Sequence, residues 1–422
     1  MSSNANQIVL IGATVRAAGE SASRAGFRVI GADLFNDSDT KAVCDLSLPI
    51  PTTNDALDRF CQICSGIDVV CVGDFFAESG SSSSADQVFQ RLSENSLVLG
   101  ATVETRSTLR NFRFLRELAH SSGMKIPLTF TREDLGPEHT TSEHTTLERH
   151  KRWLIKRQHS SGGLGVRWMN LRNSSSKTNS QSVDFKLSDD EWLQQWVAGK
   201  PMGATFLSDG DRVLLLGACR SLFTRLGSSP FVYSGSCGPV ELSGLVRGKL
   251  QKLGHELVSR TRLTGLFNVD FVVDPSGEAW LLEVNPRWSG SAELIERHFL
   301  DSQRLGSNQP PPRKSLLSVA VAIMRGEVKC GSLSDLSTQS SPVGRPFLKR
   351  VVYAHRDFSF RLDGLIDLLD PGESVHDLPT SGASIEKDAP VMTYIMDQKN
   401  TGSITNYRTR LKSLRKVIED FN

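Results

Sequence analysis

Residues 265–287 contain two apolar runs that carry acidic, amide and guanidinium side chains. Residues 267–273 and 279–284 each have the apolar composition of a strand, and the sequence Asp-Pro-Ser-Gly between them is typical of a tight turn. The two runs therefore predict an antiparallel hairpin, and its polar residues are the first candidates for chemistry.

Three polar side chains of this hairpin are predicted to share one face. With the turn centred on its Pro-Ser pair, Asp270 lies opposite Leu281 and is a diagonal neighbour of Glu283. Because alternate residues of a strand share a face, Asp270, Glu283 and Asn285 project together, and Mg²⁺ or Mn²⁺ binds such oxygen ligands. The alternative is a surface hairpin with incidental acids, and a one-residue slip would turn Asp270 to the other face.

Two arginines could act on anions near such a metal site. Arg287 follows Asn285 by two residues, where its guanidinium could stabilise charge on a transferring phosphoryl group. Arg220 lies in a strand-like run followed by a glycine-rich segment, residues 235–238, that reads as a tight loop. Arg220 could meet an anionic substrate or a phosphate, or it could be an exposed strand residue.

Residues 153–166 have the composition of a phosphate-binding segment. Residues 153–155 begin a strand, Lys156 supplies an ammonium at its end, and residues 160–165 read Ser-Ser-Gly-Gly-Leu-Gly. Such a loop can present backbone N–H groups to phosphates, with the lysine adding a point charge. No Gly-Lys-Ser/Thr follows at the spacing of a Walker A sequence, and a plain flexible turn is the alternative.

The elements that must position these residues begin with an N-terminal βαβ unit. Residues 7–11 and 27–32 read as strands around a helix at residues 16–25, and residues 68–73 and 97–100 read as further strands. This order predicts a doubly wound parallel sheet. The glycine pattern of a dinucleotide site is absent after the first strand.

Composition limits the classes of protein to which the chain could belong. With 422 residues it is too long for one core, so we expect two to four domains. The 49 basic against 47 acidic residues leave no excess positive charge for a nucleic-acid partner. No apolar run approaches the ~20 residues of a membrane span, and a polar N-terminus with seven scattered cysteines favours a cytoplasmic protein.

In this order and spacing, the segments resemble the ATP-grasp superfamily over roughly residues 5–300. The sequence from Glu283 to Arg287 is similar to the family's Glu-x-Asn-Pro-Arg strand, and Asp270 is similar to its upstream metal-ligand acid. The resemblance implies that ATP and Mg²⁺ (or Mn²⁺) are bound. The residues that it implies for the ATP phosphates are Lys156 and the glycine loop, with Ser161, Gly162, Gly163 and Gly165.

The adenosine end of the site rests on the same resemblance. Gln194, Gln195, Trp196 and Val197 are similar to the family's hinge segment, where backbone groups, here those of Gln195 and Val197, hold adenine. The chain departs from the family at Gln194, where a glutamate is common, which weakens or reverses the contact to the adenine amine. Arg110 is the nearest candidate for the family's early ATP-binding lysine.

The implied fold class is α/β, with α+β character in the ATP-grasp lobes. The expected parts are a Rossmann-like pre-ATP-grasp substrate domain, a first lobe, a second lobe with the metal site, and a small C-terminal α+β domain. Their expected bounds are residues 1–105, 106–198, 199–303 and 304–422.

The resemblance implies a ligase that activates a small-molecule carboxylate as an acyl phosphate and joins it to an amine. The segment around Arg220 and the tail at residues 378–394 are similar to carboligase-like members linked to tetrahydromethanopterin or methanofuran one-carbon metabolism. A carboxylase or kinase on the same scaffold, or a non-catalytic nucleotide-binding module, are the alternatives. We expect no nucleic-acid or membrane partner, and the sequence allows a homodimer.

Overall fold

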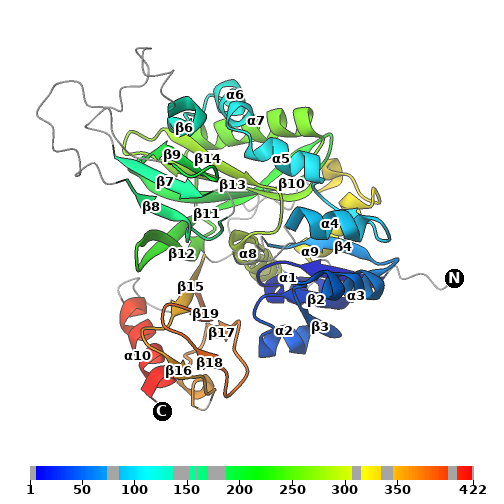
Figure 1. Ribbon diagram of the computed structural model, residues 1–422, viewed down its shortest axis with the longest axis vertical. Coiled ribbons are helices and arrows are strands. Elements are labelled where there is room, and N and C mark those ends of the chain that lie inside the picture. The colour runs from blue at the N-terminus through cyan, green and yellow to red at the C-terminus, as the bar shows by residue number, and fades with distance from the viewer. Residues whose placement is uncertain are drawn as a thin grey trace, which may run out of the picture.

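The computed structural model describes residues 6–73, 85–135, 152–157, 160–169, 187–306, 315–333, 346–362, 364–397 and 406–420. Helices and sheets alternate in layers, so the fold is α/β as expected (Figure 1). Within these residues no helix combines the length and the apolar character needed to cross a bilayer.

The N-terminal part is a parallel sheet with helices packed on it, as the sequence predicts. Its strand order is β3-β2-β1-β4-β5. The strands are β1 (Gln7–Ile11), β2 (Arg28–Asp33), β3 (Leu46–Pro49), β4 (Asp68–Cys71) and β5 (Val98–Leu99), and the helices are α1 (Arg16–Arg24), α2 (Ser38–Val43), α3 (Asn54–Cys64) and α4 (Ala85–Ser93). The sequence did not predict β3, a short edge strand with no continuous apolar run.

The next part joins two helices to a small antiparallel sheet. Asn111 separates the helices because its side chain accepts hydrogen bonds from the N–H groups of Arg113 and Phe114, which caps the second helix. The sheet has the order β6-β9-β7-β8. The elements are α5 (Val103–Arg110), α6 (Phe112–Ser122), β6 (Thr129–Thr131), β7 (Trp153–Arg157), β8 (Val166–Trp168) and β9 (Glu191–Gln195).

An eight-stranded antiparallel sheet forms the centre of the molecule, in the order β14-β13-β10-β11-β12-β15-β19-β17. One face packs on α6 and α7, and the other packs on α8 and on the N-terminal part (Figure 1). The elements are β10 (Lys200–Asp209), β11 (Val213–Leu226), β12 (Ser229–Gly238), α7 (Gly244–Thr261), β13 (Thr264–Val273), β14 (Ala279–Asn285), α8 (Gly290–Gly306), β15 (Phe347–Tyr353), β17 (Glu373–His376) and β19 (Pro390–Asp397).

The C-terminal part has a hydrophobic core of its own, but three of its strands extend the central sheet. Its other elements are β16 (Phe358–Ser359), β18 (Ser384–Ile385) and the basic helix α10 (Asn406–Asp420), which the sequence predicts at residues 408–421. The boundary expected between residues 303 and 304 falls inside α8. Of the proline-rich connection expected at residues 300–313, residues 307–313 lie outside the described residues.

Helix α9 (Leu316–Met324) follows this connection and packs between the two large sheets. Its apolar side chains share one core with Ile8 and Leu10 of β1 and with Leu207 and Leu266 of the central sheet. The N-terminal part and the central sheet are therefore joined by a continuous apolar interface.

One strand contradicts the sequence interpretation. Residues 235–238, expected to be a tight loop, form the end of β12 and pair with both β11 and β15. Gly235 has φ +133°, and an added Cβ there would lie 1.9 Å from the carbonyl oxygen of Lys349. The glycines therefore allow a close approach of neighbouring strands, where the composition had indicated a turn.

Candidate functional site

The predicted hairpin exists, but its register differs from the expected one. Asp270 lies directly opposite Glu283, because Phe271 pairs with Leu281 and the register then shifts by one residue. The shift is a β-bulge at Leu282, which no hydrophobic pattern signals. Without it, Glu283 would face away from Asp270, since a one-residue slip turns a side chain to the other face.

The bulge brings the three predicted metal-binding side chains together on one face. Nδ2 of Asn285 donates to Oδ2 of Asp270 at 2.8 Å and to Oε1 of Glu283 at 3.0 Å. Two carboxylates and an amide thus meet at the end of the β13–β14 hairpin. The described residues hold no group of three or more His, Cys, Asp or Glu side chains suited to a metal, so any metal held here would take two carboxylates, the amide oxygen and ligands from outside the chain.

The electrostatics of this cluster fit a divalent cation. Burial and the negative charge of Glu283 raise the pKa of Asp270 to about 8, while the charge of Arg287 and a hydrogen bond from Asn268 lower it. Two carboxylates held side by side repel each other, and a cation between them would remove the repulsion. The oxygen-rich donor set suits Mg²⁺ or Mn²⁺ better than a thiolate-seeking metal.

Lys156 reaches the same place from the other sheet. It lies on β7, where it pairs with Trp192 of β9 and Val166 of β8. Burial lowers the pKa of the Lys156 ammonium, and the negative charges of Glu283 and Asp270 raise it. The lysine on β7 and the carboxylates on the central sheet therefore face one site. A cation that contacts the phosphates of a metal-bound nucleotide needs this placement.

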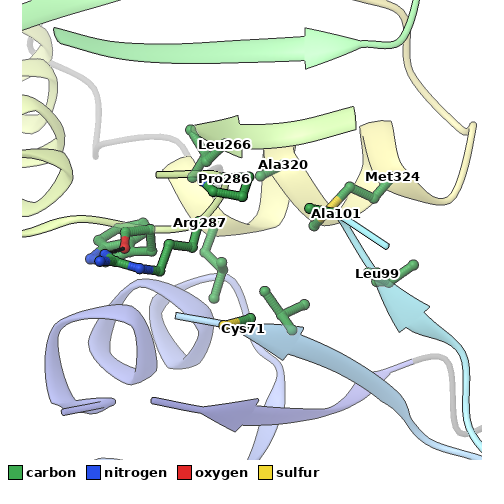
Figure 2. A pocket seen from close by; sticks show the side chains of 11 residues that line it. Cys71, Leu99, Ala101, Leu266, Pro286, Arg287, Ala320 and Met324 are labelled. Carbon is green, nitrogen blue, oxygen red and sulfur yellow. Dashed lines mark hydrogen bonds between the residues drawn. The ribbon is translucent and has the colours of Figure 1, made fainter. Parts of the chain in front are cut away.

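Arg287 lies next to the cluster. One of its guanidinium nitrogens lies 3.5 Å from Oδ1 of Asn285, and the other donates to the carbonyl of Trp288 at 3.2 Å. A small pocket of about 20 Å³, room for about one water molecule, lies between Pro286 to Trp288 and the N-terminal sheet. Figure 2 shows Cys71 and Leu99 on the sheet side of this pocket and Ala320 and Met324 of α9 on another.

The glycine loop is a described turn that ends at β8. Gly162 and Gly163 have φ of +61° and +82°, which explains glycine at both positions. At Gly165, an added Cβ would lie 2.2 Å from Oγ of Ser160, so the loop is tightly folded on itself. Ser161 lies between these residues, and its contact with phosphates stays a prediction.

The hinge segment uses most of its backbone groups internally. The N–H of Gln195 donates to the carbonyl of Leu128, and the N–H of Trp196 donates to the carbonyl of Arg152. The N–H of Val197 makes no backbone hydrogen bond to a described residue. Of the N–H groups expected to hold adenine, that of Val197 is the one left for a ligand.

Two hinge side chains have structural contacts. Gln194 is buried, and its Nε2 donates to Oγ1 of Thr129 at 3.2 Å. Trp196 packs edge-on against Trp168, and the guanidinium of Arg152 lies 4.6 Å from the Trp196 ring centre. Neither side chain therefore depends on a nucleotide for its place.

The structure does not bring Arg220 to the site. Asp270 pairs with Gly203, and Gly203 pairs with Cys219, so Cys219 shares the face of Asp270. Arg220 is the next residue on the same strand and projects from the opposite face, where it is exposed. Of the two roles left open for this residue, its face and exposure favour the exposed strand residue, and a contact with an anion stays untested.

Arg110 is the last residue of α5 and is exposed. Helix α5 packs against β14, the strand that carries Glu283. The structure places Arg110 on an element beside the metal cluster, and its contact with a nucleotide stays a prediction.

Sequence reasoning missed one residue that supports the cluster and one that joins distant parts of the chain. Asn268 precedes Asp270 by two residues, is buried, and donates to Oδ1 of Asp270 at 2.8 Å. Its period-two spacing on the same strand was the available signal. Glu293 of α8, also missed, binds Arg16 of α1 at 2.7 Å and Lys349 of β15 at 2.6 Å. These partners are far apart in the sequence, so no local pattern reveals them.

Comparison with known proteins agrees with this geometry. Residues 111–291 match the model of the ATP-grasp domain family, ATP-grasp_3. The matched residues include the hinge, the glycine loop and the three side chains Asp270, Glu283 and Asn285. No curated protein matches the chain in sequence.

Solved structures resemble the whole chain in fold. Carboxyaminoimidazole ribonucleotide synthase from Aspergillus clavatus, complexed with ATP, has a TM-score of 0.65 at 14% identity, with 99% of this chain and 100% of that chain covered. N5-carboxyaminoimidazole ribonucleotide synthetase from Thermotoga maritima has a TM-score of 0.62 at 13% identity, with 97% and 98% covered. L-amino acid ligase from Bacillus licheniformis has a TM-score of 0.61 at 15% identity, with 98% of each chain covered.

Proposed function

We propose that the protein is an ATP-dependent ligase that activates a small carboxylic acid and joins it to an amine. The observation that carries the proposal is the meeting of Asp270, Glu283 and Asn285 on one face of the central sheet, opposite Lys156. The match to the ATP-grasp domain model over residues 111–291 and the fold shared with solved ligases and synthetases support it.

The proposed reaction has two steps. A substrate carboxylate oxygen attacks the γ-phosphorus of ATP, ADP leaves, and an acyl phosphate forms. The amine nitrogen then attacks the acyl carbon, inorganic phosphate leaves with the bonding electrons, and the amine gives up a proton. The protein mainly positions the reactants and stabilises charge, as is usual for phosphoryl transfer.

Each residue of the site has a role in that reaction. Asp270, Glu283 and Asn285 would hold Mg²⁺ or Mn²⁺, which neutralises phosphate charge when it is bound. Lys156 places a positive charge at the phosphates, and the backbone N–H groups of the glycine loop lie over them. Arg287 stabilises negative charge on the transferring group. At the other end, the N–H of Val197 binds the adenine ring.

Carboxylation of an amine by bicarbonate is the second candidate, and a specific observation favours it. Two of the solved structures that share this fold over nearly the whole chain are a carboxyaminoimidazole ribonucleotide synthase and an N5-carboxyaminoimidazole ribonucleotide synthetase. In that case bicarbonate takes the place of the carboxylic acid, and carboxyphosphate takes the place of the acyl phosphate. The metal site and Lys156 keep the same roles in both reactions.

One assay separates the candidates. ADP release is measured with pooled carboxylic acids and amines, with and without bicarbonate, and the products are identified by mass spectrometry. An amide product that contains the added acid supports the ligase. ADP release that needs bicarbonate and no other acid supports the carboxylase. Phosphorylated product without amide would indicate a kinase, and binding of ATP with no turnover would indicate a nucleotide-binding module.

The amine panel also tests the narrower substrate expectation. We include pterin- and furan-containing amines, because residues 378–394 and the segment around β12 are similar to carboligase-like proteins of one-carbon metabolism. Amide formation with such an amine supports a role on a cofactor precursor. Amide formation with simple amino acids alone would refute that role and leave the ligase reaction in place.

A further inference from the structure

The β11–β12 hairpin extends beyond its neighbours in the central sheet. Residues 213–220 of β11 pair with β10, whereas residues 221–226 pair with β12. On β12, residues 235–238 pair with β15, and the residues before them do not. The tip of the hairpin, residues 221–234, is therefore a two-stranded ribbon that projects past the sheet, beside β8 (Figure 1).

The glycine loop is hydrogen-bonded to this tip. The N–H of Tyr233 donates to the carbonyl of Gly162 at 2.8 Å. Oγ of Ser229 donates to the carbonyl of Leu164 at 2.8 Å. Two carbonyls of the loop thus face the hairpin, whereas the N–H groups of Gly162 and Gly163 make no backbone hydrogen bond to a described residue.

The fit between loop and hairpin admits no side chain at Gly163. An added Cβ would lie 1.9 Å from the carbonyl oxygen of Phe231 and 2.8 Å from its carbonyl carbon. At Gly162, where φ is also positive, an added Cβ meets nothing within 4 Å. The backbone conformation explains a glycine at both positions, but contact with the hairpin explains it at Gly163 alone.

Aromatic side chains continue the contact from the hairpin to the hinge. The ring of Phe231 packs edge-on against Trp168 of β8 at 5.4 Å between centres. Trp168 packs against Trp196 of the hinge at 5.7 Å, and the guanidinium of Arg152 lies 3.8 Å from the Trp168 ring centre. Strand β8, which follows the glycine loop, and the hinge are therefore both joined through Phe231 to the β11–β12 hairpin of the central sheet.

The hairpin itself is fixed at its base. The hydroxyl of Tyr353 on β15 donates to the carbonyl of Tyr233 at 2.7 Å, and the Tyr233 hydroxyl bonds Oγ of Ser236 at 2.7 Å. An added Cβ at Gly290, the first residue of α8, would lie 2.6 Å from that Tyr233 hydroxyl. Strand β15 and the start of α8 therefore fix the position of Tyr233 at the base of the tip.

We propose that Ser229, Phe231 and the backbone of Tyr233 are positioning residues that hold the glycine loop closed over the ATP phosphates. Their observed contacts are with the carbonyls of Gly162 and Leu164 and with Gly163 of the loop. The inference rests on the proposed function in one respect, that the loop covers phosphates. Closure against a fixed support sets the loop's N–H groups in place before the reaction and keeps water from the activated acid.

The test compares nucleotide binding in two serine variants. Ser229→Ala removes the hydrogen bond to the loop, whereas Ser228→Ala changes the exposed neighbour in the two-residue turn. Affinity is measured by calorimetry for AMPPNP with Mg²⁺ and for AMP, which lacks the β and γ phosphates. For Ser229→Ala we expect AMPPNP to bind about fivefold more weakly, the value of one neutral hydrogen bond of ~1 kcal/mol. AMP affinity should stay unchanged, and Ser229→Thr should restore AMPPNP binding.

A glycine pair provides the second comparison. Gly163→Ala and Gly162→Ala place a side chain at similar positive φ, but that at Gly163 alone collides with Phe231. We expect Gly163→Ala to weaken AMPPNP binding at least tenfold more than Gly162→Ala does, because it displaces both hydrogen bonds of the loop. The difference between the two variants measures the docking alone.

The outcomes separate this inference from the proposed function. Equal AMPPNP affinities for Ser229→Ala and Ser228→Ala would overturn the inference and leave the nucleotide site intact. A parallel loss of AMP affinity would also overturn it, because the hairpin would then act on the whole fold. Failure of the wild-type protein to bind Mg²⁺-AMPPNP would overturn the proposed function as well.

Discussion

Glu293 joins three parts of the chain through one buried carboxylate. It binds Nη1 of Arg16 in α1 at 2.7 Å, Nζ of Lys349 in β15 at 2.6 Å, and Arg297 of its own helix at 3.3 Å. The residue is 3% exposed, and Arg16 is 1% exposed. Glu293→Gln keeps the shape of the side chain and removes the charge, so the partners lose the anion that they share.

The size of the effect follows from which partners remain. Arg16 keeps Asp377, at 2.9 Å, whereas Lys349, which is 7% exposed, loses the carboxylate that lies 2.6 Å from its Nζ. Removing one member of a buried pair costs about 3–5 kcal/mol, and we expect the lower end because Arg16 stays paired. If the free energy of unfolding falls by about 3 kcal/mol per molar urea, the unfolding midpoint of Glu293→Gln lies about 1 M below that of the wild type.

The effect also depends on pH in a defined direction. Burial alone would raise the pKa of Glu293, but the positive charges of Arg16, Lys349 and Arg297 outweigh it and hold the pKa well below its usual range. A carboxylate with a depressed pKa stabilises the fold above its unfolded pKa of about 4.3 and loses that contribution as pH falls through the folded pKa. The difference in the free energy of unfolding between wild type and Glu293→Gln is therefore at its full size at pH 7 and shrinks below about pH 4.

The assay is urea unfolding followed by tryptophan fluorescence at pH 7 and at lower pH. The control is Glu278→Gln, which removes the partly exposed partner of Lys249, at 2.8 Å, and should shift the midpoint far less, because solvent screens this pair. A Glu293→Gln midpoint equal to that of the control would refute the reasoning. So would a difference that grows as the pH is lowered.

Three further variants test the site and the fold. Asn268→Ala removes the donor to the metal-site aspartate and should lower the affinity of the AMPPNP complex for Mg²⁺ about tenfold by calorimetry; unchanged affinity would contradict its supporting role. Gly235→Ala should destabilise the protein by about 3 kcal/mol or more in urea, because its Cβ would collide with the carbonyl of Lys349. Gly382→Ala, with φ +87° and no neighbour within 4 Å, is the control, and equal losses would argue against strand contact as the cause. Arg220→Ala should keep ATP turnover within about twofold, as for most surface substitutions, and a large loss would show that the strand register assigned here is wrong.

The sequence predicts most elements that carry the site, because the relevant signals are local. The apolar runs at residues 267–273 and 279–284 predict the hairpin, and the turn sequence between them predicts its antiparallel pairing. The shared face of Asp270, Glu283 and Asn285 is also confirmed. The register was wrong in two steps: Leu281 pairs with Phe271 and not with Asp270, and the bulge at Leu282, which composition does not signal, then shifts the pairing once more.

The parts that the sequence does not predict depend on contacts between distant segments. Lys156 and Asp270 lie on different sheets, so their approach is a property of the fold. Glu293 received no role from the sequence, since its partners Arg16 and Lys349 are remote in the chain. Arg220 lies on the predicted strand, but only the pairing of β10 with β13 shows which face it occupies.

The central claim is that the hairpin cluster binds one divalent ion beside the nucleotide. Electron paramagnetic resonance of Mn²⁺, titrated into the protein with AMPPNP, measures this directly. We predict a single bound Mn²⁺ in the wild type and its loss in Glu283→Gln, whose side chain is exposed enough that the fold stays intact. Mn²⁺ bound with the same affinity and spectrum in a folded Glu283→Gln variant would contradict the account.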